Sequence, residues 1–412
     1  MGYDTMKERR QLAKELEQKK QELRKKNAHD DWLADDVFPS LYKRFAKKPI
    51  DEKLIVFASS KSLKVPSSMR AVYAKMSEKG YTCRFFGVPE TFKNRKAEYA
   101  WYEEFFRSYG VCRCLFIDDI FAPVYCVEPR RGQKVIQLWH TPALLRKAGY
   151  AIGKRGVAGE IVDRRLVHKN YTDVVASSQY VKNTLAAVFN CKEEIIHAWG
   201  CPRTDVYFDK DYIHKARQDL VKLVPNLVSQ IGDRKILLYA PTYRGEGANE
   251  AYTHRMLDIL LLKRFLGEKY VFLIKMHPFI KEGALMSGDL LDLVRDFAFE
   301  VPQATPIETA LCGADMLITD YSTILFEYAL LERPMLFYAF DFEHYTRRRP
   351  LFYDYATFVP GPIVYDSLQL AEAVLAQETE FDPQRVRHFA HKFMGGCDGH
   401  SVERVVHYAL KR

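Results

Sequence analysis

Short apolar runs alternate with longer amphipathic stretches along most of the chain. The first series of runs is rich in β-branched and aromatic residues and lies at 53–58, 82–88, 113–118, 134–139, 172–177 and 194–199. Runs of this length and composition predict buried strands. Between the first two runs, Met69, Val72, Tyr73 and Met76 recur at helical spacing before Gly80, which predicts a helix that ends in glycine.

A second series of runs lies at 235–240, 270–275, 315–319, 334–339 and 362–365. Strands separated by helix-length segments indicate parallel sheets covered by helices. We therefore expect an α/β fold in which two Rossmann-like domains face each other across a central cleft.

The same pattern predicts the division of the chain. We place a basic helical extension at 1–50, a first domain at 51–215, and a second domain with terminal helices at 216–412, with the junction near 210–233. The glycine-containing segment 153–159 is expected to be a mobile loop.

The composition agrees with a folded chain of two domains. At 412 residues the chain exceeds the roughly 100 to 200 residues of one domain, and 48% of its residues are hydrophobic. Its 8 cysteines form no CxxC pair and no zinc-type cluster, as in reduced cytosolic proteins. No apolar signal segment begins the sequence, and no run approaches the ~18 apolar residues of a membrane span. These features predict a soluble or peripheral protein.

Basic residues exceed acidic ones, with 62 Lys and Arg against 53 Asp and Glu and a net charge of +9. They gather at 7–10, 24–26, 43–48 and 347–349. Such clusters favour anionic partners, either lipid headgroups or phosphate-bearing substrates. For residues 5–28 taken alone, a solvated charged helix is the favoured interpretation. No nucleic-acid-binding module is present in the sequence, so we expect no nucleic-acid partner.

Two of the expected strands end in a histidine and a nearby proline. "KVIQLWHTP" places His140 and Pro142 after one strand of the first series, and "YVFLIKMHP" places His277 and Pro278 after one strand of the second. The carboxyl ends of parallel strands face the ligand crevice, so both imidazoles are candidates for chemistry there. For either histidine alone, a structural role in the core explains the pattern equally well.

Polar residues at other strand ends are suited to an anion. In "ITDYSTILFEYALLE", Asp320 opens a turn and Ser322 and Thr323 stand where a helix begins, a position that favours phosphate. A simple helix cap is the alternative. Arg203 and Arg244 follow other expected strands, and a guanidinium matches phosphate oxygens, although a surface ion pair is the commoner fate of one arginine.

Taken together, these motifs resemble the CDP-glycerol glycerophosphotransferase family, the teichoic-acid glycerol- and ribitol-phosphate transferases of GT-B-type architecture. The resemblance runs in order from about residue 134 to the C-terminus. It rests on "QLWHTPALLRKAGY", "HKNYTDVVASS", "GCPRTDVYF", "YAPTYR", "IKMHP", "ITDYSTILFEYALLERPMLFYAFDFEHY", "PGPIVYDS" and "DGHSVERVVHYAL". Two departures stand out: no glycine follows His140 until Gly149, and Glu327 stands where the family often has aspartate.

The resemblance implies roles for particular residues. His140 and His277 fall on the family's catalytic histidines. The implied substrate-binding residues are Thr141, Pro142, Arg203, Pro241, Thr242, Lys275, Ser322, Thr323 and Glu327.

The implied reaction is transfer of glycerol phosphate or ribitol phosphate from a CDP-polyol to an acceptor hydroxyl, with release of CMP. His140, with a pKa near neutrality, would take the hydroxyl proton, while His277, Arg203, Ser322 and Thr323 stabilise charge on the pyrophosphate. The acceptor would be a lipid-linked or polymeric polyol phosphate of teichoic acid or capsule, used at the inner face of the cell membrane. No cofactor is expected, and a loosely held Mg²⁺ stays open because no carboxylate cluster demands a metal.

Two other functions are compatible with the same fold. One is a GT-B glycosyltransferase that uses a nucleotide sugar. The other is a non-catalytic, membrane-associated binding protein. The sequence also leaves open glycerol or ribitol as the polyol, addition of one unit or many, and wall teichoic acid or capsule as the product.

Overall fold

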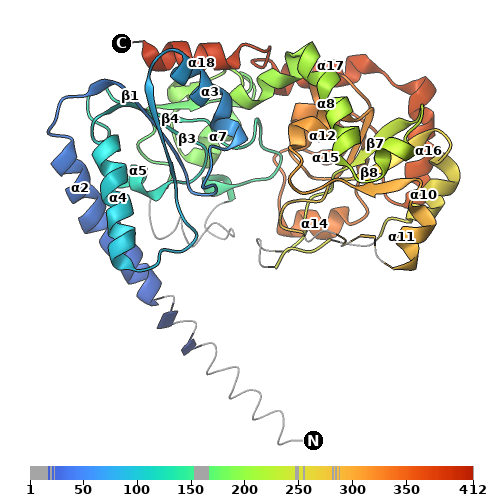
Figure 1. The fold of residues 1–412 in the computed structure, drawn as a ribbon, viewed down its shortest axis with the longest axis horizontal. Coiled ribbons are helices and arrows are strands. Elements are labelled where there is room, and N and C mark those ends of the chain that lie inside the picture. Colours follow the sequence, from blue (N-terminus) through green and yellow to red (C-terminus); the bar gives the residue numbers. More distant parts are fainter. Residues whose placement is uncertain are drawn as a thin grey trace, which may run out of the picture.

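Two parallel sheets, each covered by helices, make up the body of the protein (Figure 1). The computed structural model describes residues 17–18, 21–22, 24–152, 167–245, 250–253, 256–280, 283, 285–286 and 288–411. The loop expected at 153–159 lies outside the described residues, as does most of the chain before residue 24.

The first sheet has six strands in the order β2-β1-β3-β4-β5-β6. Its strands are β1 (Asp51–Ser59), β2 (Thr82–Gly87), β3 (Cys112–Ile117), β4 (Lys134–Gln137), β5 (Asp173–Val175) and β6 (Ile196–His197). Every pairing is parallel. Successive side chains of β1 therefore alternate between two cores, with Ile55 and Phe57 on one face and Val56 and Ala58 on the other.

Helices cover both faces of this sheet. They are α3 (Ser67–Glu78), α4 (Arg95–Tyr109), α5 (Ala122–Tyr125) and α7 (Lys182–Phe189), with short 3₁₀ turns at Gly149–Ile152 and Glu193–Ile195. Met69, Val72 and Met76 of α3 pack on the face that carries Ile55 and Phe57. The helix expected from their spacing is confirmed, and it ends just before Gly80.

The N-terminal extension packs against the edge of the first domain. A single turn of π-helix (Leu33–Val37) continues into α2 (Phe38–Phe45), which packs on α4. Phe38 and Tyr42 contact aromatic rings of α4, including Phe106 and Tyr109. Residues 33–45 of the extension are thus a structural element of the first domain.

The second sheet has six parallel strands in the order β12-β11-β10-β7-β8-β9. They are β7 (Lys235–Tyr239), β8 (Tyr270–Ile274), β9 (Ala298–Glu300), β10 (Met316–Thr319), β11 (Met335–Tyr338) and β12 (Ile363–Val364). The chain changes direction in this sheet between β7 and β10, and in the first sheet between β1 and β3. Ligands of open parallel sheets bind at such points.

The helices of the second domain lie on both faces of its sheet. They are α8 (Lys210–Leu223), α9 (Leu227–Gln230), α10 (Ile259–Leu266), α11 (Asp289–Val294), α12 (Ile307–Gly313), α13 (Ile324–Ala329), α14 (Phe342–Arg348), α15 (Tyr355–Phe358), α16 (Ser367–Glu380) and α17 (Pro383–Met394). One apolar core continues from this domain into the first, through the 3₁₀ segment Pro202–Phe208 and α8.

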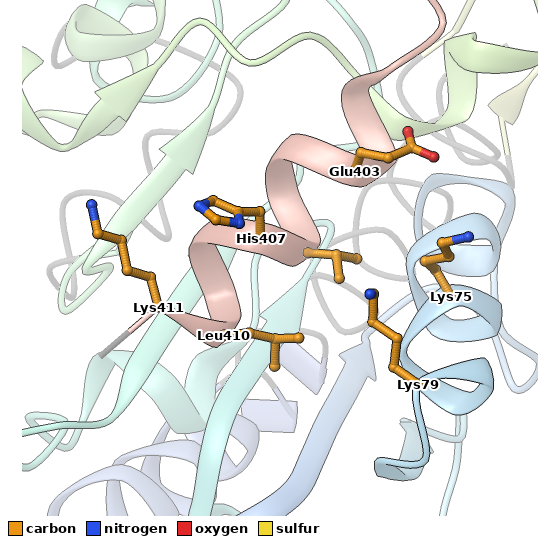
Figure 2. Close-up of a pocket in the computed structure, with 7 residues that line it drawn as sticks. Lys75, Lys79, Glu403, His407, Leu410 and Lys411 are labelled. Atoms are coloured by element: carbon orange, nitrogen blue, oxygen red, sulfur yellow. The ribbon is translucent and has the colours of Figure 1, made fainter.

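The last helix returns to the first domain. After α17 the chain crosses over, and α18 (Ser401–Leu410) packs beside α3 on the first sheet (Figure 1). The crossing requires glycine on both sides, because a Cβ on Gly200 would collide with the carbonyl oxygen of Gly396. A surface cavity of about 410 Å³ lies between the two helices, lined by Lys75 and Lys79 of α3 and by residues of α18 (Figure 2).

The α/β architecture expected from the sequence is confirmed, as are both series of strands. The sequence pattern missed only β9, a strand of three residues, among the strands that the structure describes. The domain limits 51–215 and 216–412 stay predictions: the strands fall on either side of residue 215, whereas α18 belongs spatially with the first sheet.

Asp205 anchors the returning helix. Its carboxylate accepts hydrogen bonds from the backbone N–H groups of Ser401 (3.1 Å) and Val402 (2.9 Å) at the start of α18. We expect Asp205→Ala to lower the free energy of unfolding by about 1–2 kcal/mol, because two helix N–H groups lose their acceptor. Urea unfolding followed by circular dichroism measures this. The matched control is Asp292→Ala on the exposed face of α11, and equal losses in both variants would contradict the anchoring role.

Candidate active site

A cavity of about 770 Å³ lies between the two domains. Its walls come from the loops that follow β1, β3 and β4 in the first sheet and β7, β10 and β11 in the second. Among the described residues that line it, Asp119 is the only carboxylate. The cationic lining residues are Lys61, Arg146, Lys147, Arg244, Arg347, Arg348 and Arg349. The cavity is therefore suited to an anionic ligand.

His140 lines this cavity because the chain turns sharply at the end of β4. Trp139 has a φ of 55°, in the left-handed region that non-glycine residues rarely adopt. The side chain of Gln137 holds this turn: its Oε1 accepts a hydrogen bond from the Trp139 backbone N–H at 2.9 Å. The Nε2 of the same amide donates to the carbonyl oxygen of Asp119 at 3.1 Å. One buried amide thus fixes both the His140 turn and the loop that faces it.

The Gln137 amide also belongs to a hydrogen-bond network of buried aromatic side chains. Its Nε2 also donates to the hydroxyl of Tyr171 at 3.0 Å, and that hydroxyl pairs with the hydroxyl of Tyr125 at 2.8 Å. Nδ1 of His168 lies 2.9 Å from the same Tyr171 oxygen. His168 also packs against Trp139, with ring centroids 5.6 Å apart. Burial lowers the pKa of His168 to about 4, so its ring is neutral near pH 7.

The surroundings of His140 fix its tautomer and its charge. Nδ1 lies 3.3 Å from the carbonyl oxygen of Asp118 and 3.8 Å from a carboxylate oxygen of Asp119. Both neighbours accept hydrogen bonds, so Nδ1 carries the proton and Nε2 keeps its lone pair. Desolvation in the cavity lowers the pKa of His140 to about 4, although Asp119 opposes this shift. This direction differs from the expectation of a pKa near neutrality, because the desolvation of the ring depends on neighbours that the sequence does not reveal.

His277 is next to the same cavity and has the opposite tautomer. Its ring packs on Tyr243, a lining residue, with centroids 4.5 Å apart. Nδ1 accepts a hydrogen bond from the backbone N–H of Phe279 at 3.2 Å, so the proton of the neutral ring is on Nε2. Burial and the nearby Arg146 lower its pKa to about 4. His140 thus presents an acceptor nitrogen, and His277 presents a donor.

The loops after β7 and β10 meet at the point where the second sheet changes direction. The backbone N–H of Thr242 donates to Asp320 at 2.8 Å, and Pro241 is buried beside it. Arg244 is buried and pairs with Asp341 (2.7 Å) and Asp320 (3.0 Å), which explains why its pKa is raised despite burial. Arg244 therefore joins three strand-end loops.

Ser322 and Thr323 lie at the start of α13, as the sequence predicts. Thr323 lines the cavity, whereas the hydroxyl of Ser322 accepts a hydrogen bond from the backbone N–H of Ile324 at 3.4 Å. Two more hydroxyls, those of Thr141 and Thr242, are buried and have no hydrogen-bond partner within the described part of the chain. Such groups are available to a ligand.

Arg203 and Glu327 bind each other. The guanidinium Nε lies 2.9 Å from a carboxylate oxygen of Glu327, and another nitrogen lies 3.5 Å from Glu308. Burial raises the pKa of Glu327 and Arg203 opposes this shift; for Arg203, the two carboxylates outweigh burial and raise its pKa. Arg203 also donates to the carbonyl oxygen of His140 at 2.9 Å. The pair thus links the His140 turn, through Arg203, to Glu327 of the second domain.

Two further residues of the implied site have structural contacts. Lys275 is buried, and its ammonium group donates to the carbonyl oxygens of Pro302 (2.7 Å) and Gln303 (3.0 Å) in the loop after β9. Pro142 is buried, and its carbonyl oxygen lies 3.9 Å from the sulfur of Cys201. Lys275 thus joins the loop after β8 to the loop after β9, and Pro142 belongs to the loop that lines the cavity.

Sequence reasoning missed several residues of this region. It assigned no role to Gln137, Asp119, His168 or Arg146, although "QLWHTPALLRKAGY" and "HKNYTDVVASS" contain three of them. A polar glutamine inside an apolar strand was the available signal. Within the described ranges, no group of three His, Cys, Asp or Glu residues could hold a metal ion, and no helix is long and apolar enough to cross a membrane.

Comparisons with known sequences identify the family of the chain. The model of the family described as CDP-glycerol:poly(glycerophosphate) glycerophosphotransferase matches residues 40–411. The chain is 33% identical to the teichoic acid poly(ribitol-phosphate) polymerase of Bacillus spizizenii, over 91% of this chain and 59% of that protein. It is 31% identical to the ribitol-phosphate primase of the same organism, over 90% of this chain and 95% of that protein.

A third relative is the ribitol-phosphate polymerase TarL of Staphylococcus aureus, 35% identical over 72% of this chain and 51% of that protein. The chain therefore spans little more than half the length of these two polymerases. Among solved structures, the wall teichoic acid polymerase TagF has a TM-score of 0.70 at 23% identity, covering 97% of each chain. The fold is thus of the GT-B type.

The Arg203–Glu327 pair yields a stability prediction. We expect Arg203→Met to lower the free energy of unfolding by about 3 kcal/mol, because Glu327 is left charged and buried without its partner. The double variant Arg203→Met with Glu327→Leu is expected to lose at least ~1 kcal/mol less than the sum of the single losses. Urea unfolding of the four proteins measures this difference. Strict additivity would show that the two side chains do not act together.

Proposed function

Because this chain belongs to the CDP-glycerol:poly(glycerophosphate) glycerophosphotransferase family, we propose that it transfers a polyol phosphate from a CDP-polyol to a hydroxyl group of a teichoic-acid acceptor. The family match over residues 40–411 is the observation that carries this proposal. The cationic cavity and the two neutral histidines beside it support the same reaction.

The reaction forms one bond and breaks one. An acceptor hydroxyl oxygen attacks the phosphorus that carries the polyol, the bond from that phosphorus to the CMP oxygen breaks, and CMP leaves with the bond's electron pair. The hydroxyl proton passes to the enzyme. Catalysis then depends on a correctly placed base and on stabilisation of the phosphate charge.

His140 is the proposed base. Nε2 holds its lone pair because Nδ1 is committed to Asp118, and the low pKa keeps the ring neutral at physiological pH. When Nε2 gains the proton, Asp119 at 3.8 Å stabilises the positive charge. The carboxylate therefore favours the protonated state that forms during the reaction.

His277 has the complementary role. Its Nε2–H can donate to a pyrophosphate oxygen, as can the unpartnered hydroxyls of Thr141 and Thr242. Thr323 lines the same cavity at the start of α13. Donors fixed before the substrate binds stabilise developing negative charge without a reorganisation cost.

Ribitol is the polyol that the relatives favour. Relatives named for ribitol phosphate are 31% to 35% identical to this chain. Those named for glycerol phosphate are 24% to 28% identical. We therefore propose CDP-ribitol as the preferred donor.

The rival functions make different predictions. UDP-GlcNAc 2-epimerase from Neisseria meningitidis has a TM-score of 0.53 at 13% identity, so this fold also serves nucleotide sugars. A nucleotide-sugar transferase would release a nucleoside diphosphate from a sugar donor and no CMP from a CDP-polyol. A non-catalytic binding protein would bind the donor without any turnover.

We expect purified protein with CDP-ribitol and a polyol-phosphate acceptor to release CMP, and His140→Ala to lower kcat by about 10²- to 10⁴-fold. The donor KM should change little, because His140 acts on the acceptor hydroxyl. The matched control is His407→Ala on the exposed face of α18, which should keep the wild-type rate. Equal rates for His140→Ala and wild type would exclude His140 as the base.

The pH profile of the wild-type enzyme checks the same assignment. A base works only when it is unprotonated, and the pKa of about 4 keeps His140 unprotonated at any pH well above 4. We therefore expect kcat/KM to stay level from pH 7.5 down to about 5.5. A fall centred near pH 6.5, the pKa of an ordinary histidine, would contradict it.

The protein is also proposed to act at the inner face of the cell membrane. Exposed basic residues of the N-terminal extension support this: Arg24, Lys25, Lys26, Lys43, Arg44, Lys47 and Lys48. At low salt the protein should sediment with anionic vesicles and not with neutral ones, and added salt should release it. Equal recovery with both kinds of vesicle would contradict electrostatic attachment.

A further inference from the structure

The cations of the cavity wall fall into two groups. Arg244 pairs with Asp320 and Asp341, and Lys61 pairs with Asp119. Arg349 stacks on Tyr243 and donates to backbone carbonyl oxygens of the loop after β7. The charges of Arg244, Lys61 and Arg349 thus interact with other groups of the protein.

The other four cations have little or nothing to neutralise them. Among the residues that the structure describes, the Arg146 side chain donates only to the hydroxyl of Tyr345, at 3.3 Å. Arg347 pairs with Glu343 at 3.2 Å, but both side chains are about four-fifths exposed, so this pair is weak. Lys147 and Arg348 have no ion pair or side-chain hydrogen bond with any residue that the structure describes.

Direct backbone pairing brings these four cations together. The loop that follows His140 and the loop that follows α14 form a short antiparallel bridge between the domains at Arg146 and Leu351. The Lys147 N–H donates to the carbonyl oxygen of Pro350 at 2.9 Å, and the Phe352 N–H donates to that of Leu145 at 2.9 Å. Arg146 and Lys147 thus lie beside the end of α14, which carries Arg347 and Arg348.

This cationic cluster lies on other segments of the chain than the groups proposed to hold the donor, within the same cavity, and Arg146 is near enough to His277 to lower its pKa. Those groups follow β4, β7, β8 and β10, at Thr141, Thr242, His277 and Thr323. The cluster follows β11 and the distal part of the His140 loop, at Arg146, Lys147, Arg347 and Arg348. The pyrophosphate of a CDP-polyol is one dianion, so four additional cations, of which only Arg347 has an ion pair among the described residues, exceed what the donor requires.

We propose that Arg146, Lys147, Arg347 and Arg348 form a binding site for a phosphodiester group of the acceptor. This inference rests on the proposed function and names the acceptor as an anionic polyol-phosphate chain. Its phosphodiester binds at the bridge between the domains, and its terminal hydroxyl extends toward His140, which begins the same loop. Arginine binds phosphate oxygens through two parallel hydrogen bonds, which orients the chain as well as attracting it.

The test uses the double variant Arg347→Ala with Arg348→Ala. Both side chains are exposed, so the fold should survive their loss. The matched control is Lys75→Ala with Lys79→Ala in the remote cavity between α3 and α18, which removes the same net charge (Figure 2). Each protein is assayed for CMP release with a short polyol-phosphate oligomer and with the free polyol as acceptors.

We expect the KM for the oligomer to rise at least about tenfold in the arginine variant, as for loss of one charge-assisted hydrogen bond or more. The KM for the free polyol and the KM for the donor should change less than about twofold, and the lysine control should match wild type. A rise in the donor KM would assign the arginines to the donor. An unchanged KM for the oligomer would overturn the proposal.

A binding measurement separates this proposal from the proposed function. Calorimetric titration of the oligomer into each protein needs no turnover. If wild type releases no CMP from either CDP-polyol but still binds the oligomer through the arginines, the reaction fails and the site stands. Binding of anionic vesicles through the arginines, without binding of the oligomer, would make the cluster a membrane contact and overturn it as an acceptor site.

Discussion

The side-chain amide of Gln137 is the constraint on which the arrangement of the cavity depends. A strand that simply continued past Gln137 would carry His140 along the sheet edge and away from the facing loop. Because the amide binds the Trp139 N–H, the Asp119 carbonyl and the Tyr171 hydroxyl, the chain turns through a left-handed residue and His140 lines the cavity. A buried amide left without these partners would cost free energy, so the turn and the network stabilise each other.

In the second domain, ion pairs in place of an amide hold the strand-end loops together. Arg244 joins the loops after β7, β10 and β11 through Asp320, Asp341 and the Thr242 carbonyl, as Gln137 joins the loops of the first domain. The charged network is buried, so it stabilises the loops only while every member is paired. Arg203 and Glu327 extend the same principle across the domain junction, to the carbonyl oxygen of His140. The strand-end loops of the cavity are therefore held by buried polar networks, whereas Arg347 and Arg348, which also line it, are exposed.

Much of the fold could be predicted from the sequence, because the strands are short, apolar and separated by clear helical stretches. It missed β9, since "AFE" is too short to stand out next to a charged segment. The positions of His140 and His277 followed from the rule that strand ends face the ligand. Their tautomers and low pKa values did not, because these depend on neighbours that only the fold brings close. The same holds for Arg203 and Glu327, which are 124 residues apart in the chain.

The return of α18 to the first sheet has a consequence for synthesis of the protein. Residues 401–410 cover the face of the first sheet that carries Ile55 and Phe57, and they are made after every strand of the second sheet. On the ribosome this face has no complete cover until the second domain has already emerged. Domains generally fold from the N-terminus as they are synthesised. Here the core of the first domain is completed only after the second sheet has been made, and a chain that stops before residue 401 leaves part of one face of the first sheet uncovered.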